Sequence, residues 1–200
     1  EAGGLGRLIP LGDRGAARGV CERLLASNAR HADAHHLLGV IAYDEGKNAD
    51  AIRAVQLALS ISDAAAYHNT LCMLLTGARD IDAALKHGRR ALALQPNYAQ
   101  AHFNVGQALQ RGGRTIEAVD AYRQATRVDP RFALAHSSLG DALLANDAVD
   151  DAIAAYRKAI DCEPRFAQAH NNLGNAWRAL GQIENAIGAY QRAIELAPSL

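Results

Sequence analysis

The 200-residue chain carries no formal net charge, because 21 Lys and Arg side chains balance 21 Asp and Glu side chains. This balance argues against nucleic acid as a partner, since neutralising phosphates requires a basic excess. Half of the residues are apolar but only 5% are aromatic, so we expect a core built from small aliphatic side chains.

No stretch reaches the roughly 18 consecutive apolar residues of a membrane span, and the first residues lack the pattern of a secretory leader. We therefore expect a cytoplasmic protein with no membrane partner. The three cysteines, Cys21, Cys72 and Cys162, lack metal-ligand spacing and are interpreted as reduced, packed side chains. The chain has no initiator methionine and stops abruptly, which suggests a fragment of a longer protein.

The first dozen residues make a poor helix, because Gly3, Gly4, Gly6 and Pro10 fall among them. We expect this segment to be irregular. Residues 13–29 then read as the second helix of a partial repeat that spans 1–31.

Beyond residue 31 the sequence repeats itself with a period of 34 residues. Residues 105–130, 139–164 and 173–198 align without gaps, residues 71–96 continue the register, and residues 38–63 precede them with one residue missing. A period of this length indicates a repeat architecture. The predicted full repeats are 32–64, 65–98, 99–132, 133–166 and 167–200.

Each repeat is predicted to contain two amphipathic helices, A and B, because apolar residues recur at spacings of three and four. Small residues recur at places 8, 20 and 27 of the repeat, where they allow close helix packing. Place 8 holds Gly39, Cys72, Gly106, Gly140 and Gly174. The bulky residues of place 24 are Val55, Tyr122, Tyr156 and Tyr190, with Gly88 as the exception.

Proline and glycine mark the ends of the predicted helices. Pro96, Pro130, Pro164 and Pro198 follow helix B of their repeats, where a residue without an N–H ends one helix and admits the next. Gly46, Gly113 and Gly181 fall between helices A and B, so a short turn with positive φ is expected there. Short turns make the two helices antiparallel neighbours.

These residues resemble the tetratricopeptide-repeat (TPR) family. In the last repeat the motif reads Leu173-Gly174, Trp177, Ala186, Tyr190 and Pro198. The resemblance covers residues 13–200 and implies an all-α fold, a right-handed superhelix of about five full helix-turn-helix repeats plus the partial first one. It further implies a single solenoid over residues 1–200, with the A helices lining a concave groove.

The resemblance places six positions of each A helix in that groove, and in this chain they are rich in Asn, Gln, Ser and Thr. Such side chains suit hydrogen bonds to the backbone of an extended peptide, although a solvated polar helix face would also look like this. With few cations in the lining, a clamp for a C-terminal carboxylate is disfavoured. The candidate peptide-binding residues are Asn69, Thr70, Phe103, Asn104, Gln107, Arg111, Ser138, Asp141, Asn171, Asn172, Asn175 and Arg178.

The phrases ALAHSSLGDAL and AQAHNNLGNAW are similar to the TPR arm of O-linked N-acetylglucosamine transferases and their bacterial relatives. In those proteins an asparagine ladder at place 6 grips the backbone of the substrate peptide. Only Asn104 and Asn172 match that ladder among the five repeats. The resemblance therefore implies, at most, a substrate-recognition role for this region.

The eight histidines invite a metal-site interpretation. Five of them occupy place 4 of successive repeats, too far apart for one ion by usual helix-packing distances, so we interpret that series as structural. His31, His35 and His36 straddle a predicted helix start and could hold an adventitious metal. No nucleophile elbow, phosphate loop or zinc-protease helix is present. We therefore expect no catalytic residue, no metal site and no cofactor.

Three functions follow as hypotheses. The first is a non-catalytic protein- or peptide-binding scaffold that uses the concave groove of the A helices. The second is the substrate-recognition arm of a glycosyltransferase-like enzyme. The third is an architectural module that self-associates end to end, because the last B helix exposes Ile187, Tyr190 and Ile194 when nothing covers it.

Overall fold

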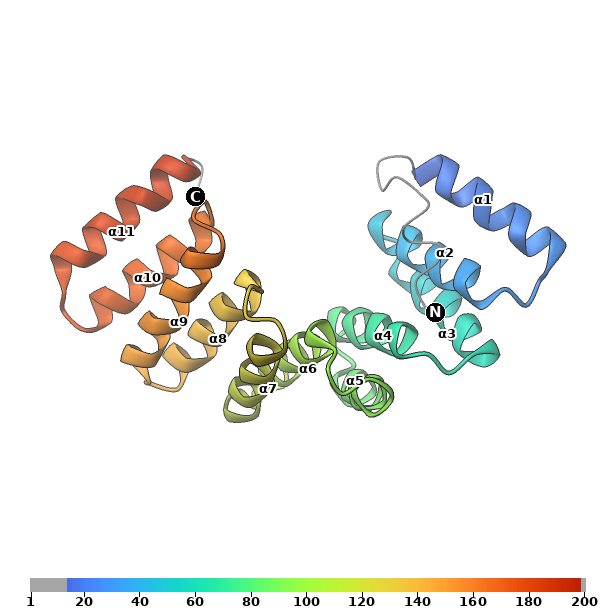
Figure 1. Cartoon of the computed structure of the whole chain (residues 1–200), viewed down its shortest axis with the longest axis horizontal. Helices are drawn as coiled ribbons and strands as arrows, with labels where there is room; N and C mark the ends of the chain where they lie inside the picture. Colours follow the sequence, from blue (N-terminus) through green and yellow to red (C-terminus); the bar gives the residue numbers. More distant parts are fainter. Residues whose placement is uncertain (1–13, 199–200) are drawn as a thin grey trace. The chain divides into compact units, whose positions relative to one another are not determined.

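The chain folds into successive pairs of antiparallel helices (Figure 1). The computed structural model describes residues 14–198, and all eleven regular elements within that range are α-helices. The predicted irregular segment over residues 1–12 lies outside the described residues. The helices are α1 (Arg14–Ser27), α2 (Ala32–Asp44), α3 (Asn48–Ile61), α4 (Ala65–Gly77), α5 (Ile81–Leu94), α6 (Ala99–Arg111), α7 (Thr115–Val128), α8 (Ala133–Ala145), α9 (Val149–Cys162), α10 (Ala167–Ala179) and α11 (Ile183–Leu196).

The helix pairs confirm the predicted all-α class and the count of five full repeats plus a partial one. Helix A of the full repeats begins at Ala32, Ala65, Ala99, Ala133 and Ala167, the first residues of the predicted repeats. The contacts group the chain into an N-terminal half, which ends at Pro96, and a C-terminal half, which begins at Asn97. The single continuous solenoid over residues 1–200 stays a prediction.

Buried alanines form much of the core, as the composition predicted. At place 20 the alanines from Ala51 to Ala186 are at most 3% exposed, and at place 27 those from Ala58 to Ala193 are at most 3% exposed. Because a methyl group occupies so little space, two helix backbones can approach closely at these places. All three cysteines are free thiols, with Cys21 and Cys72 buried.

The turn inside each repeat uses the same backbone conformation whether or not glycine is present. Gly46, Gly113 and Gly181 have φ values of 76°, 74° and 72°, as predicted. The equivalent residues of the other two repeats, Arg79 and Asp147, have φ values of 63° and 61°. A side chain in this conformation costs about 1 kcal/mol. The packing of the two helices therefore imposes the turn, and glycine only makes it easier to form.

Helices A and B of a repeat are in tight contact between place 8 and place 24. A Cβ atom added to Gly140 would lie 2.5 Å from Cε1 of Tyr156. At Gly106 the added atom would lie 2.6 Å from Cε1 of Tyr122. Both separations are too short for real carbon atoms, so the ring occupies the volume that a side chain at place 8 would need.

The repeat 65–98 keeps this contact with the sizes of the two residues exchanged. Cys72 occupies place 8 and Gly88 occupies place 24, and both residues are buried. The Cys72 thiol reaches the backbone of Gly88, and burial raises the pKa of this thiol to about 12. The absence of an aromatic residue at place 24 is thus matched by a larger residue at place 8.

The histidines of place 4 fix the loops that enter the A helices. Nε2 of His136 lies 3.0 Å from the Pro130 carbonyl oxygen, and Nε2 of His170 lies 3.1 Å from that of Pro164. His35 makes the same contact, at 3.0 Å, with the carbonyl oxygen of Ala29. A carbonyl oxygen only accepts, so Nε2 carries the hydrogen in each case. At these three positions the structure confirms the predicted structural role of the series.

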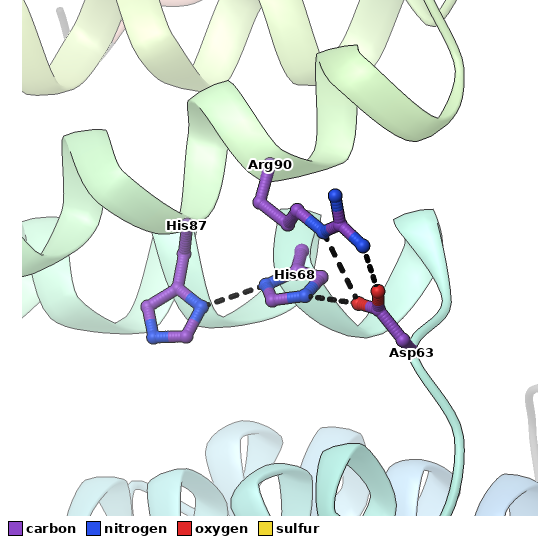
Figure 2. A network of polar contacts seen from close by, with 4 residues as sticks. All are labelled: Asp63, His68, His87 and Arg90. Carbon is purple, nitrogen blue, oxygen red and sulfur yellow. Dashed lines mark hydrogen bonds and ion pairs between the residues drawn. The ribbon is translucent and has the colours of Figure 1, made fainter.

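His68 finds a different partner because the preceding repeat is one residue short. Its Nε2 lies 2.8 Å from Oδ1 of Asp63, a residue of the loop before α4 (Figure 2). Arg90 on α5 forms an ion pair with the same carboxylate. His87, also on α5, places its Nδ1 2.7 Å from Nδ1 of His68. The four side chains form one continuous polar network that joins the loop, α4 and α5.

Only one hydrogen can lie between the Nδ1 atoms of His68 and His87. The Asp63 carboxylate accepts from Nε2 of His68, and hydrogen bonds from Arg90 and His68 lower the pKa of Asp63. Nδ1 of His68 can then accept a hydrogen from Nδ1 of His87. Burial lowers the pKa of His87, and the nearby His68 and Lys86 lower it further. Protonating both rings would turn two N–H groups against each other.

Substitution of the place-8 glycine tests the contact between place 8 and place 24. We expect Gly140→Ala to lower the free energy of unfolding by about 1–3 kcal/mol, because the new methyl group collides with the Tyr156 ring. Gly188→Ala is the matched control, since Gly188 lies within α11 with open space around its added Cβ. This control should raise stability by up to about 1 kcal/mol. Chemical denaturation that gave the same change for both variants would contradict the packing argument.

Acidification tests the histidine pair. Because the pKa of His87 is lowered in the folded state, the unfolded chain binds that proton more readily, and stability falls as the pH drops below the usual histidine value of about 6.5. His87→Gln offers His68 an amide N–H at any pH. Between about pH 7.5 and about pH 5, we expect this variant to lose roughly 0.5–1.5 kcal/mol less unfolding free energy than the parent protein. Identical losses in denaturation experiments would show that the pair does not titrate as described.

Candidate functional site

The twelve candidate peptide-binding residues all lie on A helices, divided between the two halves of the chain. Asn69 and Thr70 belong to α4 in the N-terminal half. The other ten belong to the C-terminal half: Phe103, Asn104, Gln107 and Arg111 on α6, Ser138 and Asp141 on α8, and Asn171, Asn172, Asn175 and Arg178 on α10.

Three of these residues, Asp141, Asn172 and Asn175, line one hollow in the C-terminal half. The hollow has a volume of about 290 Å³ and lies between α8, α9 and α10. Leu144 and Ala145 of α8 form part of its wall, one turn beyond Asp141 on the same helix face. Tyr156 of α9 completes the lining.

Hydrogen bonds hold the polar side chains of this hollow in place. Asn172 Nδ2 donates to Asp141 Oδ1 at 2.8 Å, and the Tyr156 hydroxyl donates to the same oxygen at 2.8 Å. Gln168 Nε2 donates to Asn172 Oδ1, also at 2.8 Å. Asn172 therefore donates with its nitrogen and accepts with its oxygen, which fixes its orientation.

The carboxylate of Asp141 sits in an environment that disfavours its charge. Burial raises the pKa of this carboxyl group, and the hydrogen bonds from Tyr156 and Asn172 oppose the change. Burial, together with the negative charge of Asp141, also raises the pKa of the Tyr156 phenol. The phenol therefore remains a hydrogen-bond donor.

Asn175 is oriented by the neighbouring B helix. The Tyr190 hydroxyl of α11 donates to Asn175 Oδ1 at 2.8 Å. Among residues 14–198, no side chain or backbone group forms a hydrogen bond with Asn175 Nδ2. Asn175 thus presents two N–H donors at the edge of the hollow.

Several candidate residues are buried and offer little surface to a ligand. Phe103 is 2% exposed and packs against Tyr122 and Phe132, with ring centroids 5.7 and 5.1 Å apart. Asn104 is 3% exposed and accepts a hydrogen bond from its helix neighbour Gln100. The position of Phe103, which is place 5 of its repeat, therefore belongs to the core.

The remaining candidates are more accessible but are not gathered into the hollow. Gln107, Ser138 and Asn171 are half-buried, while Arg111 and Arg178 are exposed in the last turns of α6 and α10.

In the N-terminal half, Asn69 is buried, with 7% of its surface exposed. Thr70 donates to the carbonyl oxygen of Ala66 at 3.0 Å and contacts Nε2 of His36 at 2.8 Å. Thr70 therefore joins α4 to α2 within the N-terminal half.

Sequence reasoning assigned the tyrosines of place 24 to packing and missed their polar role. The rings of Tyr156 and Tyr190 do pack against Gly140 and Gly174. Their hydroxyl groups, however, orient Asp141 and Asn175 in the lining. The polar role could have been predicted from the presence of tyrosine rather than phenylalanine at this place, because a buried phenol usually has a hydrogen-bond partner.

The histidines near the start of α2 each have a separate partner. His31 caps the helix by accepting from the backbone N–H of Ala34, while His35 and His36 contact Ala29 and Thr70. Across residues 14–198, no group of three or more His, Cys, Asp or Glu side chains is arranged to hold a metal ion. None of the helices in this range combines the length and hydropathy needed to cross a bilayer.

Solved structures share this fold at low sequence identity. MamA from Desulfovibrio magneticus RS-1 is 20% identical, with 84% of this chain and 96% of MamA covered and a TM-score of 0.74. TTC0263 from Thermus thermophilus is 22% identical, with 84% and 92% covered and a TM-score of 0.69. YrrB, described as a TPR protein with an unusual peptide-binding site, is 16% identical, with 91% and 94% covered and a TM-score of 0.69.

No curated protein matches the chain. Two family models, both described as "Tetratricopeptide repeat", do match it. One matches residues 9–67, 73–119 and 106–165, and the other matches residues 167–200. Together they span nearly the whole sequence and agree with the helix pairs seen in the structure. The chain therefore belongs to the tetratricopeptide-repeat family.

Proposed function

We propose that this chain is a non-catalytic scaffold that binds an extended peptide along its A helices, with the hollow between α8, α9 and α10 as the centre of the site. The single observation that carries the proposal is the set of fixed polar groups in that hollow. Asp141, Asn172 and Asn175 are each held by a hydrogen bond from another side chain. Groups that are already ordered lose little entropy when a ligand binds.

The free hydrogen-bonding capacity of the hollow matches a peptide backbone. An extended residue offers one N–H donor and one carbonyl acceptor. Asn175 Nδ2 can donate to such a carbonyl, and an amide oxygen, which has two lone pairs, can accept from an N–H. This recognition needs no particular side chain on the peptide. The description of YrrB as a TPR protein with a peptide-binding site supports the proposal.

The transferase hypothesis has a narrower basis. It rests on the asparagines of place 6, and the two differ in accessibility, since Asn104 is buried and Asn172 is half-buried. Only Asn172 is therefore available to a ligand as that hypothesis requires. Finding a transferase domain in the parent polypeptide would support it, whereas a parent without one would remove it.

End-to-end association is favoured by a separate observation. Along α11, Ile183, Ile187 and Ile194 are 55%, 50% and 56% exposed. Exposed isoleucines on one helix are suited to burial against another apolar helix face.

Substitution of the asparagines tests the scaffold. A peptide is first selected from a random displayed library against the whole chain, and its affinity is measured by fluorescence anisotropy. We expect the double variant Asn172→Ala, Asn175→Ala to weaken binding by about tenfold or more, because two amides that contact the peptide are lost. Asn185→Ala, on the exposed surface of α11, is the matched control and should bind normally. A library that yields no peptide, or unchanged binding by the double variant, would refute the proposal.

Sedimentation equilibrium tests the architectural alternative. If α11 mediates association, the apparent mass of the parent protein should rise with concentration, and Ile187→Glu should restore the monomer mass because a charge cannot be buried without a partner. Ile116→Glu is the control, since Ile116 is 68% exposed on α7. A parent protein that stays monomeric at all concentrations rules this alternative out.

A further inference from the structure

We propose that the hollow around Asp141 is a pocket for one basic side chain, a lysine or arginine of the bound peptide. This inference rests on the proposed function for its peptide ligand and adds the side-chain preference that backbone recognition alone lacks.

The shape of the lining suits a long side chain with a polar head. Asp141, Leu144 and Ala145 follow one another along one face of α8, so an aliphatic wall leads to a carboxylate. Lysine and arginine have that same order of parts, an aliphatic stem and a cationic end. A volume of about 290 Å³ accommodates either side chain together with the adjoining backbone.

The charge of the lining points to a cation. Both groups that hydrogen-bond to Asp141, the Tyr156 phenol and the Asn172 amide, are neutral, and both donate to Oδ1. No arginine, lysine or histidine among residues 14–198 forms an ion pair with Asp141. The second oxygen, Oδ2, therefore remains for the ligand.

A third neutral group, the Tyr122 phenol of α7, lies near enough to the carboxylate for the charge of Asp141 to raise its pKa. Arg111 on α6 acts on the same phenol in the opposite direction. A partly buried carboxylate whose hydrogen-bond partners are neutral is stabilised when a cation binds to it, and burial raises the pKa of Asp141.

Other side chains fit this lining less well. An acidic side chain would meet the charge of Asp141, and an apolar one would bury the carboxylate with no compensating donor. An ammonium or guanidinium group can donate to Oδ2 of Asp141 and, with a remaining N–H group, to Oδ1 of Asn175, which accepts one hydrogen bond from Tyr190 and has a second lone pair. The arrangement thus discriminates by charge as well as by shape.

The preference is measured on the peptide, which leaves the protein fold unaltered. Each basic residue of the selected peptide is replaced in turn by norleucine, which keeps the four-carbon stem of lysine without its charged amino group. We expect one position at which this replacement weakens binding by about tenfold. Asp141→Asn should abolish the difference between the two peptides, whereas Asp161→Asn, on the exposed surface of α9, should preserve it. A peptide that binds without any basic preference overturns the pocket and leaves the scaffold intact.

A small compound tests the side-chain pocket independently of peptide binding along the A helices. Acetyl-lysine-methylamide is titrated into the protein while NMR follows the side-chain amide signals of Asn172 and Asn175, with acetyl-norleucine-methylamide as the control. Shifts with the lysine compound alone, absent in Asp141→Asn, would support the pocket even if no library peptide binds. Equal responses to the two compounds, or no response to either, would overturn it.

Discussion

The fold depends on one contact that every full repeat must satisfy, the approach of place 8 on helix A to place 24 on helix B. In three repeats a tyrosine ring fills the volume above a glycine, and in the repeat 32–64 Val55 lies against Gly39. The repeat 65–98 reverses the order with Cys72 and Gly88. Close-packed interiors tolerate a change of size on one side only when the other side compensates. The pair, rather than either residue, is thus the unit that specifies the helix hairpin.

The same contact determines where the polar groups of the candidate site lie. Because Gly140 has no side chain, the Tyr156 ring can lie against helix A of its repeat. In that position the hydroxyl group of Tyr156 reaches Asp141, the residue that follows Gly140. Tyr190 reaches Asn175 by the same geometry across Gly174. Packing and recognition therefore share residues, and changes at place 24 act on both. Phenylalanine at this place would keep the packing of the two helices, but Asp141 and Asn175 would lose the hydrogen bonds that they accept from the tyrosine hydroxyl groups.

The helices could be predicted from the sequence alone, but the candidate site could be predicted only in part. Period, turn residues and small residues are local properties of the chain, and the predicted repeat 133–166, for example, begins at the residue where α8 begins. Exposure of individual groove positions could not be predicted in this way, because it depends on side chains from neighbouring helices. Phe103 illustrates this, since two aromatic neighbours draw it into the core. The network around Asp63 also escaped prediction, because it joins residues that are distant in sequence.

The shortened repeat before α4 shows that losing one residue can change chemistry as well as length. At His35, His136 and His170 the place-4 histidine donates to a main-chain carbonyl, an acceptor that does not gain or lose a proton in the physiological pH range. At His68 the deletion replaces that acceptor with a carboxylate, and a second imidazole joins the contact. This junction therefore contains a carboxylate and a second imidazole in addition to the place-4 histidine. Through His87, whose pKa is lowered by burial, this junction couples the packing of α4 and α5 to the acidity of the surrounding solution.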